Sequence, residues 1–250
     1  MNYINPPQNP PTHVTHRTFY SKALNHEIGY NIYLPPDYED SGARYPVLYH
    51  LHGWTGNESS EIWTLERTYS GGGTIVVFPN NSPVIDELEN LPVETMVIHD
   101  LIPHIDGEYR TDASRESRTL SGFSMGGGMA FLYAIKHPEL FSGVTAYAGT
   151  YHHYYNRGFD TVGVTPEAAT ALYREMISEG KDLEEGNILY WVRKHAEDIR
   201  ETLYLELRVG TEDILFGDNE ILHMYLQSLD IPHTYRKFEG VAHELSKLIP

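Results

Sequence analysis

The residues of this chain most able to do chemistry stand at Gly122-Phe123-Ser124-Met125-Gly126-Gly127. This segment follows a short apolar run and opens a helical pattern over 125–137. A serine on a sharp turn between a strand and a helix is typical of a nucleophile elbow, and glycines two before and two after it relieve backbone crowding. The N-terminus of a helix also favours developing negative charge. A Gly-x-Ser-x-Gly pattern by itself also fits a turn that only packs. Whether Ser124 is a nucleophile therefore depends on whether the sequence also offers a base and an acid.

The elements that must position this serine alternate along the chain. Continuous apolar runs predict strands buried on both faces, and alternating ones predict half-buried strands. The expected strands are 14–20, 27–34, 45–51, 74–78, 119–120, 142–148, 203–209 and 234–238, and the expected helices are 58–69, 94–109 (bent near Pro103), 125–137, 166–178 (with Thr165 as its N-cap), 188–199 and 218–229.

This alternation predicts an α/β fold with a mostly parallel central sheet and helices on both faces. The length of 250 residues fits one domain, 1–250. Four prolines in 1–11 predict an extended arm, and 150–202 interrupts the alternation as a lid-like insertion would.

Composition limits the partners and the location. Lys+Arg 18 against Asp+Glu 35 gives a net charge of −17, which disfavours nucleic acid and anionic membrane as partners. The chain has no cysteine, hence no disulfide and no thiolate metal site. No stretch of the sequence is long and apolar enough to span a bilayer, and no signal peptide begins at Met1. We therefore expect a cytoplasmic protein, or a secreted one whose leader is absent from this chain.

A serine nucleophile needs a base and an acid, which in chain order would follow it. The carboxyl ends of parallel strands meet at one edge of the sheet, and His243 follows the last strand there. Asp213 is the preferred acid over its neighbour Glu212, which should point to the other side of the loop. Asp218 is expected to be a helix N-cap.

Other histidines have simpler explanations. Adjacent His152 and His153 suit neither one helix face nor one strand face, so a metal pair there is not favoured. His99 and His104 lie on a helix and are expected at the surface or its boundary. We therefore expect no metal and no cofactor.

The tetrahedral intermediate needs two donors for its oxyanion. The backbone N–H of Met125, the residue after the nucleophile, is one. The loop His52-Gly53-Trp54 follows an earlier strand, and the N–H of Trp54 is assigned as the other, although this indole could simply pack. Further aromatic and amide side chains are expected on the same rim, where they could line a substrate pocket: Asn80, Tyr151, Tyr154 and Trp191.

The chain resembles the putative-esterase family of α/β hydrolases, and within it the feruloyl esterases of carbohydrate esterase family 1. The matching segments are 32–38, 45–53, 100–105, 118–127, 210–215 and 240–243. The resemblance implies the same triad, Ser124, Asp213 and His243, with oxyanion amides at Trp54 and Met125. Related hydrolases of formylglutathione typically carry a histidine before the serine and a cysteine after the His-Gly pair. Phe123 and the absence of cysteine count against that branch.

The resemblance implies a serine carboxylic ester hydrolase acting on a small-molecule or polysaccharide ester, most simply hydroxycinnamoyl esters of plant cell walls and xylan. Two alternatives stay open: an acetylxylan or other small acyl esterase, and an acyltransferase of the same fold. A non-catalytic carbohydrate-binding relative fits less well, because the elbow and the triad are complete in the sequence. The chain's 19 Tyr and 3 Trp would suit stacking on phenolic or sugar rings, and they suit core packing equally.

Overall fold

A computed structural model describes residues 2–82, 92–151, 161–185 and 187–249. By its internal contacts the chain divides into two compact units, Met1–Leu120 and Ser121–Pro250. The single domain over 1–250 and the lid at 150–202 stay predictions. Within the described ranges, no helix is long and apolar enough to cross a membrane.

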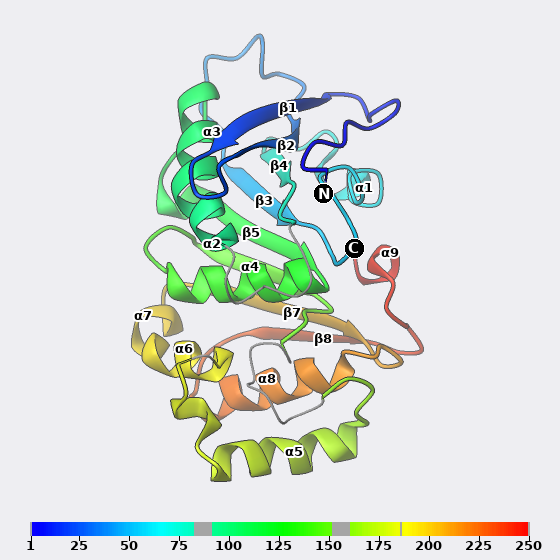
Figure 1. The fold of residues 1–250 in the computed structure, drawn as a ribbon, viewed down its shortest axis with the longest axis vertical. Helices are drawn as coiled ribbons and strands as arrows, with labels where there is room; N and C mark the ends of the chain where they lie inside the picture. Colours follow the sequence, from blue (N-terminus) through cyan, green and yellow to red (C-terminus); the bar gives the residue numbers. More distant parts are fainter. Residues whose placement is uncertain (1, 83–91, 152–160, 186, 250) are drawn as a thin grey trace. The chain divides into compact units, whose positions relative to one another are not determined.

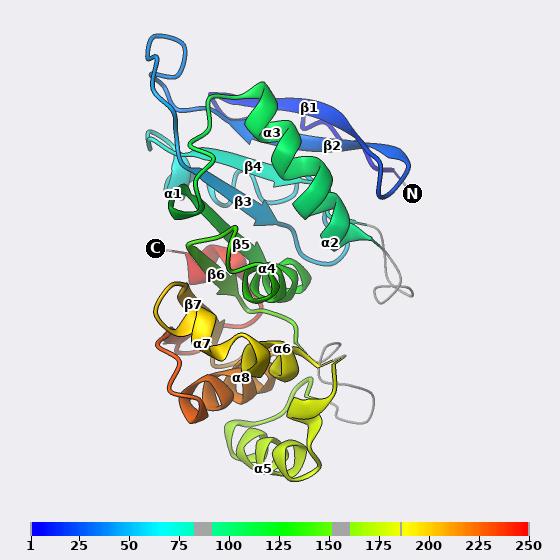
Figure 2. The same cartoon turned by 90° about the vertical axis from the view of Figure 1, so that its left-hand side faces the viewer.

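Among its described residues, the first unit contains four strands in the order β1-β2-β4-β3 and several short helices. Its strands are β1 (Val14–Ser21), β2 (His26–Tyr33), β3 (Val47–Leu51) and β4 (Ile75–Pro79); its helices are α1 (Glu66–Tyr69), α2 (Val93–Thr95), the π-helix η1 (Met96–Leu101), α3 (Ile102–Glu108) and the 3₁₀ turn η2 (Arg115–Ser117). β1 pairs antiparallel with β2 and β2 with β4, whereas β3 and β4 are parallel. The segment α2-η1-α3 crosses one face of these strands (Figure 2).

Sequence pattern explains most of this unit. Every residue of β4 is buried, as an apolar run in a covered parallel sheet requires. The helix predicted over 94–109 forms, and its irregular part is a π-helical turn just before Pro103, whose missing N–H removes a ladder bond. His99 is exposed and His104 half-buried, as expected.

The second unit carries the strands β5-β6-β7-β8 in that order, with β6, β7 and β8 parallel to one another. The strands are β5 (Arg118–Phe123, which begins just before the unit does), β6 (Gly143–Tyr147), β7 (Tyr204–Gly210) and β8 (Thr234–Phe238); the helices are α4 (Met125–Lys136), α5 (Pro166–Ser178), η4 (Lys181–Leu183), α6 (Ile188–Lys194), α7 (Ala196–Arg200), α8 (Phe216–Ser228) and α9 (Leu245–Leu248). α8 lies between the strands and α5 (Figure 1). Thr165 caps α5 as predicted, since its side chain accepts from the Ala168 amide at 3.3 Å.

Three predicted helices were wrong in extent. Only 66–69 of the helix predicted over 58–69 forms, and residues 58–65 form turns and bends instead. In these turns the carboxylates of Glu58 and Glu61 accept hydrogen bonds from Asn80 and from the Gly53 amide, respectively. The helix predicted over 188–199 breaks at His195 into α6 and α7. The helix predicted over 218–229 begins two residues earlier, at Phe216.

The described residues of the proline-rich arm, 2–11, form no helix or strand, and the arm is anchored. The Gly29 amide donates to the Tyr3 carbonyl at 2.7 Å, and the Tyr3 ring stacks on His26 with 4.9 Å between centroids. These contacts attach the start of the arm to the β1-β2 hairpin.

Candidate active site

Ser124 stands on a strained turn between β5 and α4. Its φ of 55° and ψ of −119° are rare for a residue with a side chain, and such strain concentrates at functional sites. A Cβ on Gly122 would overlap the Gly126 carbonyl, which explains why glycine is needed there. The Ser124 amide donates to the Tyr147 carbonyl at 2.9 Å, and the Ser124 carbonyl accepts from Thr150 at 3.0 Å, so the end of β6 holds the turn.

The sequence-predicted acid and base meet in the second unit. His243 Nδ1 lies 2.9 Å from Asp213 Oδ2 and 3.0 Å from Oδ1. The Asp213 side chain is fully buried, whereas that of His243 keeps 28% of its surface exposed. Asp213 Oδ1 also accepts from the Leu215 amide at 2.8 Å. A buried carboxylate in this position fixes the tautomer of the imidazole and stabilises its cation.

Backbone bonds join the loops that carry this pair. The Glu212 amide donates to the Val241 carbonyl at 3.0 Å, and the Gly240 amide donates to Thr211 Oγ1 at 2.9 Å. A Cβ on Gly210 would overlap the Val241 carbonyl, so this close approach requires glycine. Glu212 points to solvent while Asp213 is buried, which confirms the predicted division between the two carboxylates.

A short helix that the sequence analysis did not foresee follows the histidine. α9 buries Leu245 and Leu248, and Arg208 on β7 donates through Nη1 to the Leu248 carbonyl at 3.1 Å. Glu206 accepts from Arg208 Nε at 2.9 Å and orients the guanidinium. The segment that carries His243 is thus anchored on both sides. No local pattern could have identified Arg208, because its partner lies 40 residues away.

Phe123, the residue before the nucleophile, stacks on the candidate base. The rings of Phe123 and His243 lie 4.6 Å apart between centroids at an interplanar angle of 27°. Since Phe123 and Ser124 are joined by one peptide bond, this stack brings the imidazole alongside the elbow. The sequence analysis used Phe123 only to separate families and missed this contact.

The predicted role of Asp218 was wrong. α8 begins at Phe216, so Asp218 lies inside its first turn and not at the N-cap, and the helix has no side-chain cap. Its buried carboxylate accepts instead from the Tyr151 amide at 2.9 Å and from the Thr161 hydroxyl. Asp218 therefore connects α8 to the segment that follows β6.

The predicted oxyanion donors lie on two different units. Met125 is the first residue of α4, whose leading amides have no partner within the helix. Trp54 belongs to the first unit, where its side chain is 43% exposed. In that unit the Gly53 amide donates to Glu61 Oε1 at 3.0 Å and the His52 amide to Asn81 Oδ1 at 2.8 Å. Both donor assignments stay predictions.

Histidines around the Gly53 loop are structural. His50 Nε2 lies 2.5 Å from Glu61 Oε2. Burial lowers the pKa of His52, whose Nδ1 contacts the Gly53 carbonyl at 2.8 Å. These two rings therefore help to fix the loop between β3 and α1.

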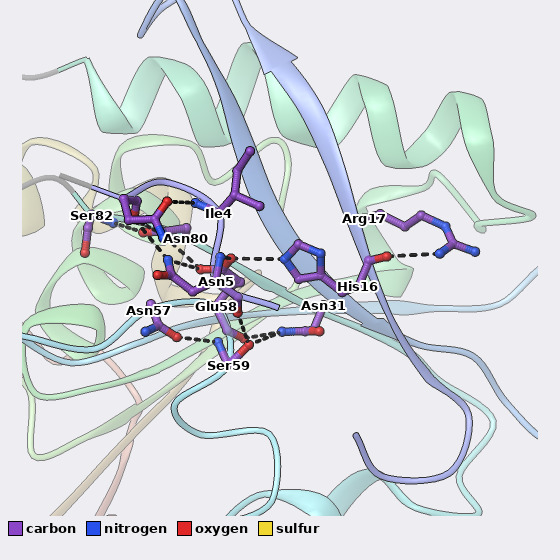
Figure 3. Close-up of polar contacts among 11 residues, drawn as sticks. Ile4, Asn5, His16, Arg17, Asn31, Asn57, Glu58, Ser59, Asn80 and Ser82 are labelled. Atoms are coloured by element: carbon purple, nitrogen blue, oxygen red, sulfur yellow. Dashed lines mark hydrogen bonds and ion pairs between the residues drawn. The ribbon is translucent and has the colours of Figure 1, made fainter. Parts of the chain in front are cut away.

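Asn80 belongs to a buried polar cluster in the first unit, formed with Glu58, Asn5 and His16 (Figure 3). Asn80 Nδ2 donates to Glu58 Oε2 at 2.9 Å, and the same oxygen accepts from Asn5 Nδ2 at 3.1 Å. His16 Nε2 lies 3.1 Å from Glu58 Oε1, which also accepts from the Asn5 amide. The Asn80 side chain is 1% exposed and serves this cluster; its contact with substrate stays a prediction.

Of the aromatic residues predicted to line the pocket, the structure describes Tyr151 and Trp191. Tyr151 is fully buried and packs edge-on against Phe131 of α4. Tyr154, like His152 and His153, lies outside the described residues. Trp191 contacts Lys136 Nζ at 4.9 Å, at the opposite end of α4 from Ser124. Twelve residues of α-helix span about 18 Å, so the structure does not bring Trp191 to the elbow.

In the parts of the chain that the structure describes, no three His, Asp or Glu side chains are grouped to hold a metal.

Comparison with solved structures defines the class of fold. A ferulic acid esterase aligns over 94% of this chain and 92% of its own with a TM-score of 0.72 at 24% identity. The S-formylglutathione hydrolase FrmB of Staphylococcus aureus aligns over 94% of both chains with a TM-score of 0.73 at 16% identity. At these identities the likeness shows the fold alone, and it confirms the predicted α/β-hydrolase architecture.

The family follows from sequence. The model of the family described as "Putative esterase" matches residues 21–219, and the chain belongs to this family. An esterase of Mycobacterium tuberculosis is 33% identical over 143 residues, which are 52% of this chain and 31% of the relative. An endo-1,4-beta-xylanase/feruloyl esterase of Xylanibacter ruminicola is 31% identical over 145 residues, covering 50% of this chain and 20% of the relative. The chain thus spans less than a third of the length of these curated relatives.

Proposed function

We propose that this chain is a serine carboxylic ester hydrolase that works through an acyl-enzyme, with Ser124 as nucleophile, His243 as base and Asp213 as orienting acid. The observation that supports it best is the contact of the His243 imidazole with buried Asp213 on one edge and with Phe123 on one face. Phe123 directly precedes Ser124, which stands on a strained turn, so this arrangement supports His243 as the base for that serine. Membership of the esterase family supports the same reaction class.

In the proposed mechanism, His243 removes the proton of the Ser124 hydroxyl as its oxygen attacks the ester carbonyl. The tetrahedral oxyanion accepts a hydrogen bond from the Met125 amide at the start of α4. Collapse expels the alcohol, which takes the proton from the imidazolium and leaves an ester of Ser124. Water, deprotonated by the same imidazole, then attacks this ester and releases the carboxylic acid.

For the acyl group we propose hydroxycinnamates esterified to plant cell-wall polysaccharide. Two of the relatives, from Xylanibacter ruminicola and Aspergillus clavatus, carry feruloyl esterase in their names, and this supports the choice. No described contact of the second unit favours an acetyl ester or acyl transfer over this substrate.

The test is an ester panel with methyl ferulate, methyl p-coumarate, acetylated xylan and p-nitrophenyl acetate, run with and without an added acceptor alcohol. We expect release of free ferulate and p-coumarate, and labelling of Ser124 by a fluorophosphonate. Turnover of acetyl esters with no ferulate release would reject the acyl assignment, and a new ester of the acceptor as the main product would indicate a transferase. Activity lost to EDTA and restored by zinc would reject the serine mechanism.

A further inference from the structure

The contact between Phe123 and His243 suggests a role beyond packing. Both residues lie in the second unit, Phe123 at the last position of β5 and His243 on the loop after β8. Their rings are nearly parallel, at 27°, and 4.6 Å apart between centroids. One face of the imidazole is therefore covered by the face of a benzene ring.

Asp213 and Phe123 constrain the imidazole in complementary ways. Asp213 holds its Nδ1 edge at 2.9 Å and so sets which nitrogen faces away from the acid. A hydrogen bond to one edge still allows the ring to tilt about that bond, and the stacked Phe123 blocks this motion. The other charged groups of the loop are directed elsewhere: Glu212 is exposed, and Glu244 pairs with Lys247 at 2.9 Å.

The face of an aromatic ring also attracts cations. In the proposed mechanism His243 is neutral in the resting enzyme and becomes a cation when it accepts the serine proton. An attraction that exists only for the cation stabilises the transition state without strengthening substrate binding, so it should raise kcat and not lower KM.

We propose that Phe123 is a positioning residue for His243, which fixes the plane of the imidazole and stabilises its cation through the aromatic face. The inference rests on the proposed serine-esterase function and deepens it. It gives the residue before the nucleophile a task that an aliphatic side chain cannot perform.

Replacement of the ring tests the proposal directly. In Phe123→Leu and Phe123→Met the apolar volume is largely kept and the aromatic face is lost. We expect kcat for the turned-over ester to fall about 3- to 30-fold with KM within about twofold. Phe123→Tyr keeps the face and should restore kcat to within about threefold of the wild type. Phe131→Leu, the same change on buried α4, controls for general loss of packing and should leave kcat within about threefold once the protein is folded.

A second measurement does not depend on turnover. In the Ser124→Ala protein, the His243 imidazole protons should be shifted upfield in NMR spectra by the Phe123 ring, and Phe123→Leu in that background should remove the shift. Loss of the shift together with the kcat effect supports the proposal. A Leu variant with wild-type kcat, a Tyr variant as slow as the Leu variant, or a purely KM effect would overturn it.

The outcomes separate this inference from the proposed function. If Ser124→Ala remains active, the serine mechanism itself fails whatever Phe123 does. If Ser124→Ala is inactive and Phe123→Leu turns over normally, the mechanism stands and only the role of Phe123 is rejected.

Discussion

Each unit contains carboxylates that are at most 12% exposed and bind imidazoles, and the difference between these pairs is instructive. In the second unit Asp213 is fully buried and His243 keeps 28% of its side chain exposed. In the first unit the ring of His50, bound to Glu61, is 1% exposed. Glu58, which binds His16, is fully buried and has further donors in Asn5 and Asn80.

The carboxylate–imidazole hydrogen bond alone therefore does not identify a catalytic site. In the pairs of the first unit the imidazole side chains are less exposed, at 1% for His50 and 16% for His16. In the Asp213–His243 pair the imidazole remains accessible and contacts the residue next to a strained serine. The comparison predicts that the first-unit pairs contribute to stability and the second-unit pair to rate, and the following experiments test this division.

The largest effect is expected from the serine. Ser124→Ala should lower kcat/KM for the best ester about 10⁴-fold or more and leave the thermal midpoint near that of the wild type, because the hydroxyl is the nucleophile. Ser228→Ala, which removes a hydroxyl bound to the Tyr225 carbonyl at the end of α8, is the control and should retain full activity. A Ser124→Ala protein within tenfold of wild type would remove the nucleophile from the comparison.

The next effect concerns Asp213 and Asp218, two buried aspartates of the second unit. Asp213→Asn should lower kcat by about 10⁴-fold, since an amide stabilises the wrong tautomer of His243. Asp218→Asn should lower the free energy of unfolding by about 1–3 kcal/mol, through weaker bonds to Tyr151 and Thr161, while kcat stays within tenfold. Comparable rate losses in the two variants would mean that Asp213 has no special task. Steady-state kinetics and chemical denaturation of both variants measure kcat and the free energy of unfolding.

In the first unit we expect an effect on stability. Glu58→Gln places an amide nitrogen either against the Nδ2 groups of Asn5 and Asn80 or against the Asn5 backbone amide, and should lower the free energy of unfolding by about 2–4 kcal/mol. Glu139→Gln is the matched control: its carboxylate lies 3.5 Å from His137 but is 65% exposed, so a change of about 0.5 kcal/mol or less is expected. Equal losses in urea unfolding would contradict the importance of burial.

The last effect is a pH dependence in the pair formed by His223 on α8 and His233, which directly precedes β8. Burial, followed by the charge of His233 at 2.7 Å, lowers the pKa of His223 to about 4. The unfolded chain binds this proton below about pH 6.5, and the folded protein binds it only near pH 4. Stability should therefore fall as pH drops from about 6.5 to about 4 and level off below that.

His223→Gln should flatten this part of the stability curve, measured as the urea midpoint at closely spaced pH values. His99→Gln is the control, because His99 is exposed on η1 and should leave the slope as it is. An unchanged slope in His223→Gln would show that other groups carry the pH dependence.

Features of the fold and the site could be predicted from the sequence where the cause is local or follows chain order. The turn at Ser124 requires glycine at 122, and the alternation of strands and helices sets the order in which Asp213 and His243 follow. The α/β-hydrolase fold and most element bounds were predicted for the same reason.

The remainder depends on contacts between distant residues. The sequence does not reveal that Asp218 binds Tyr151, that Tyr151 is buried beside Phe131, or that Trp191 packs at the far end of α4. The stack of Phe123 on His243 joins positions 120 residues apart in sequence, and no pattern along the chain marks it.

The anchored arm has a practical consequence for anyone who produces or fuses this protein. The Tyr3 carbonyl accepts a hydrogen bond from Gly29 and Asn5 donates to Glu58, so the first described residues of the chain cover the buried Glu58 carboxyl group. An affinity tag or carrier protein joined upstream should be separated from Asn2 by a flexible linker. A protease that removes the tag should cut before Asn2. Conversely, a reporter attached at Gln8 or Asn9, which are exposed, should leave the contacts of Tyr3 and Asn5 intact.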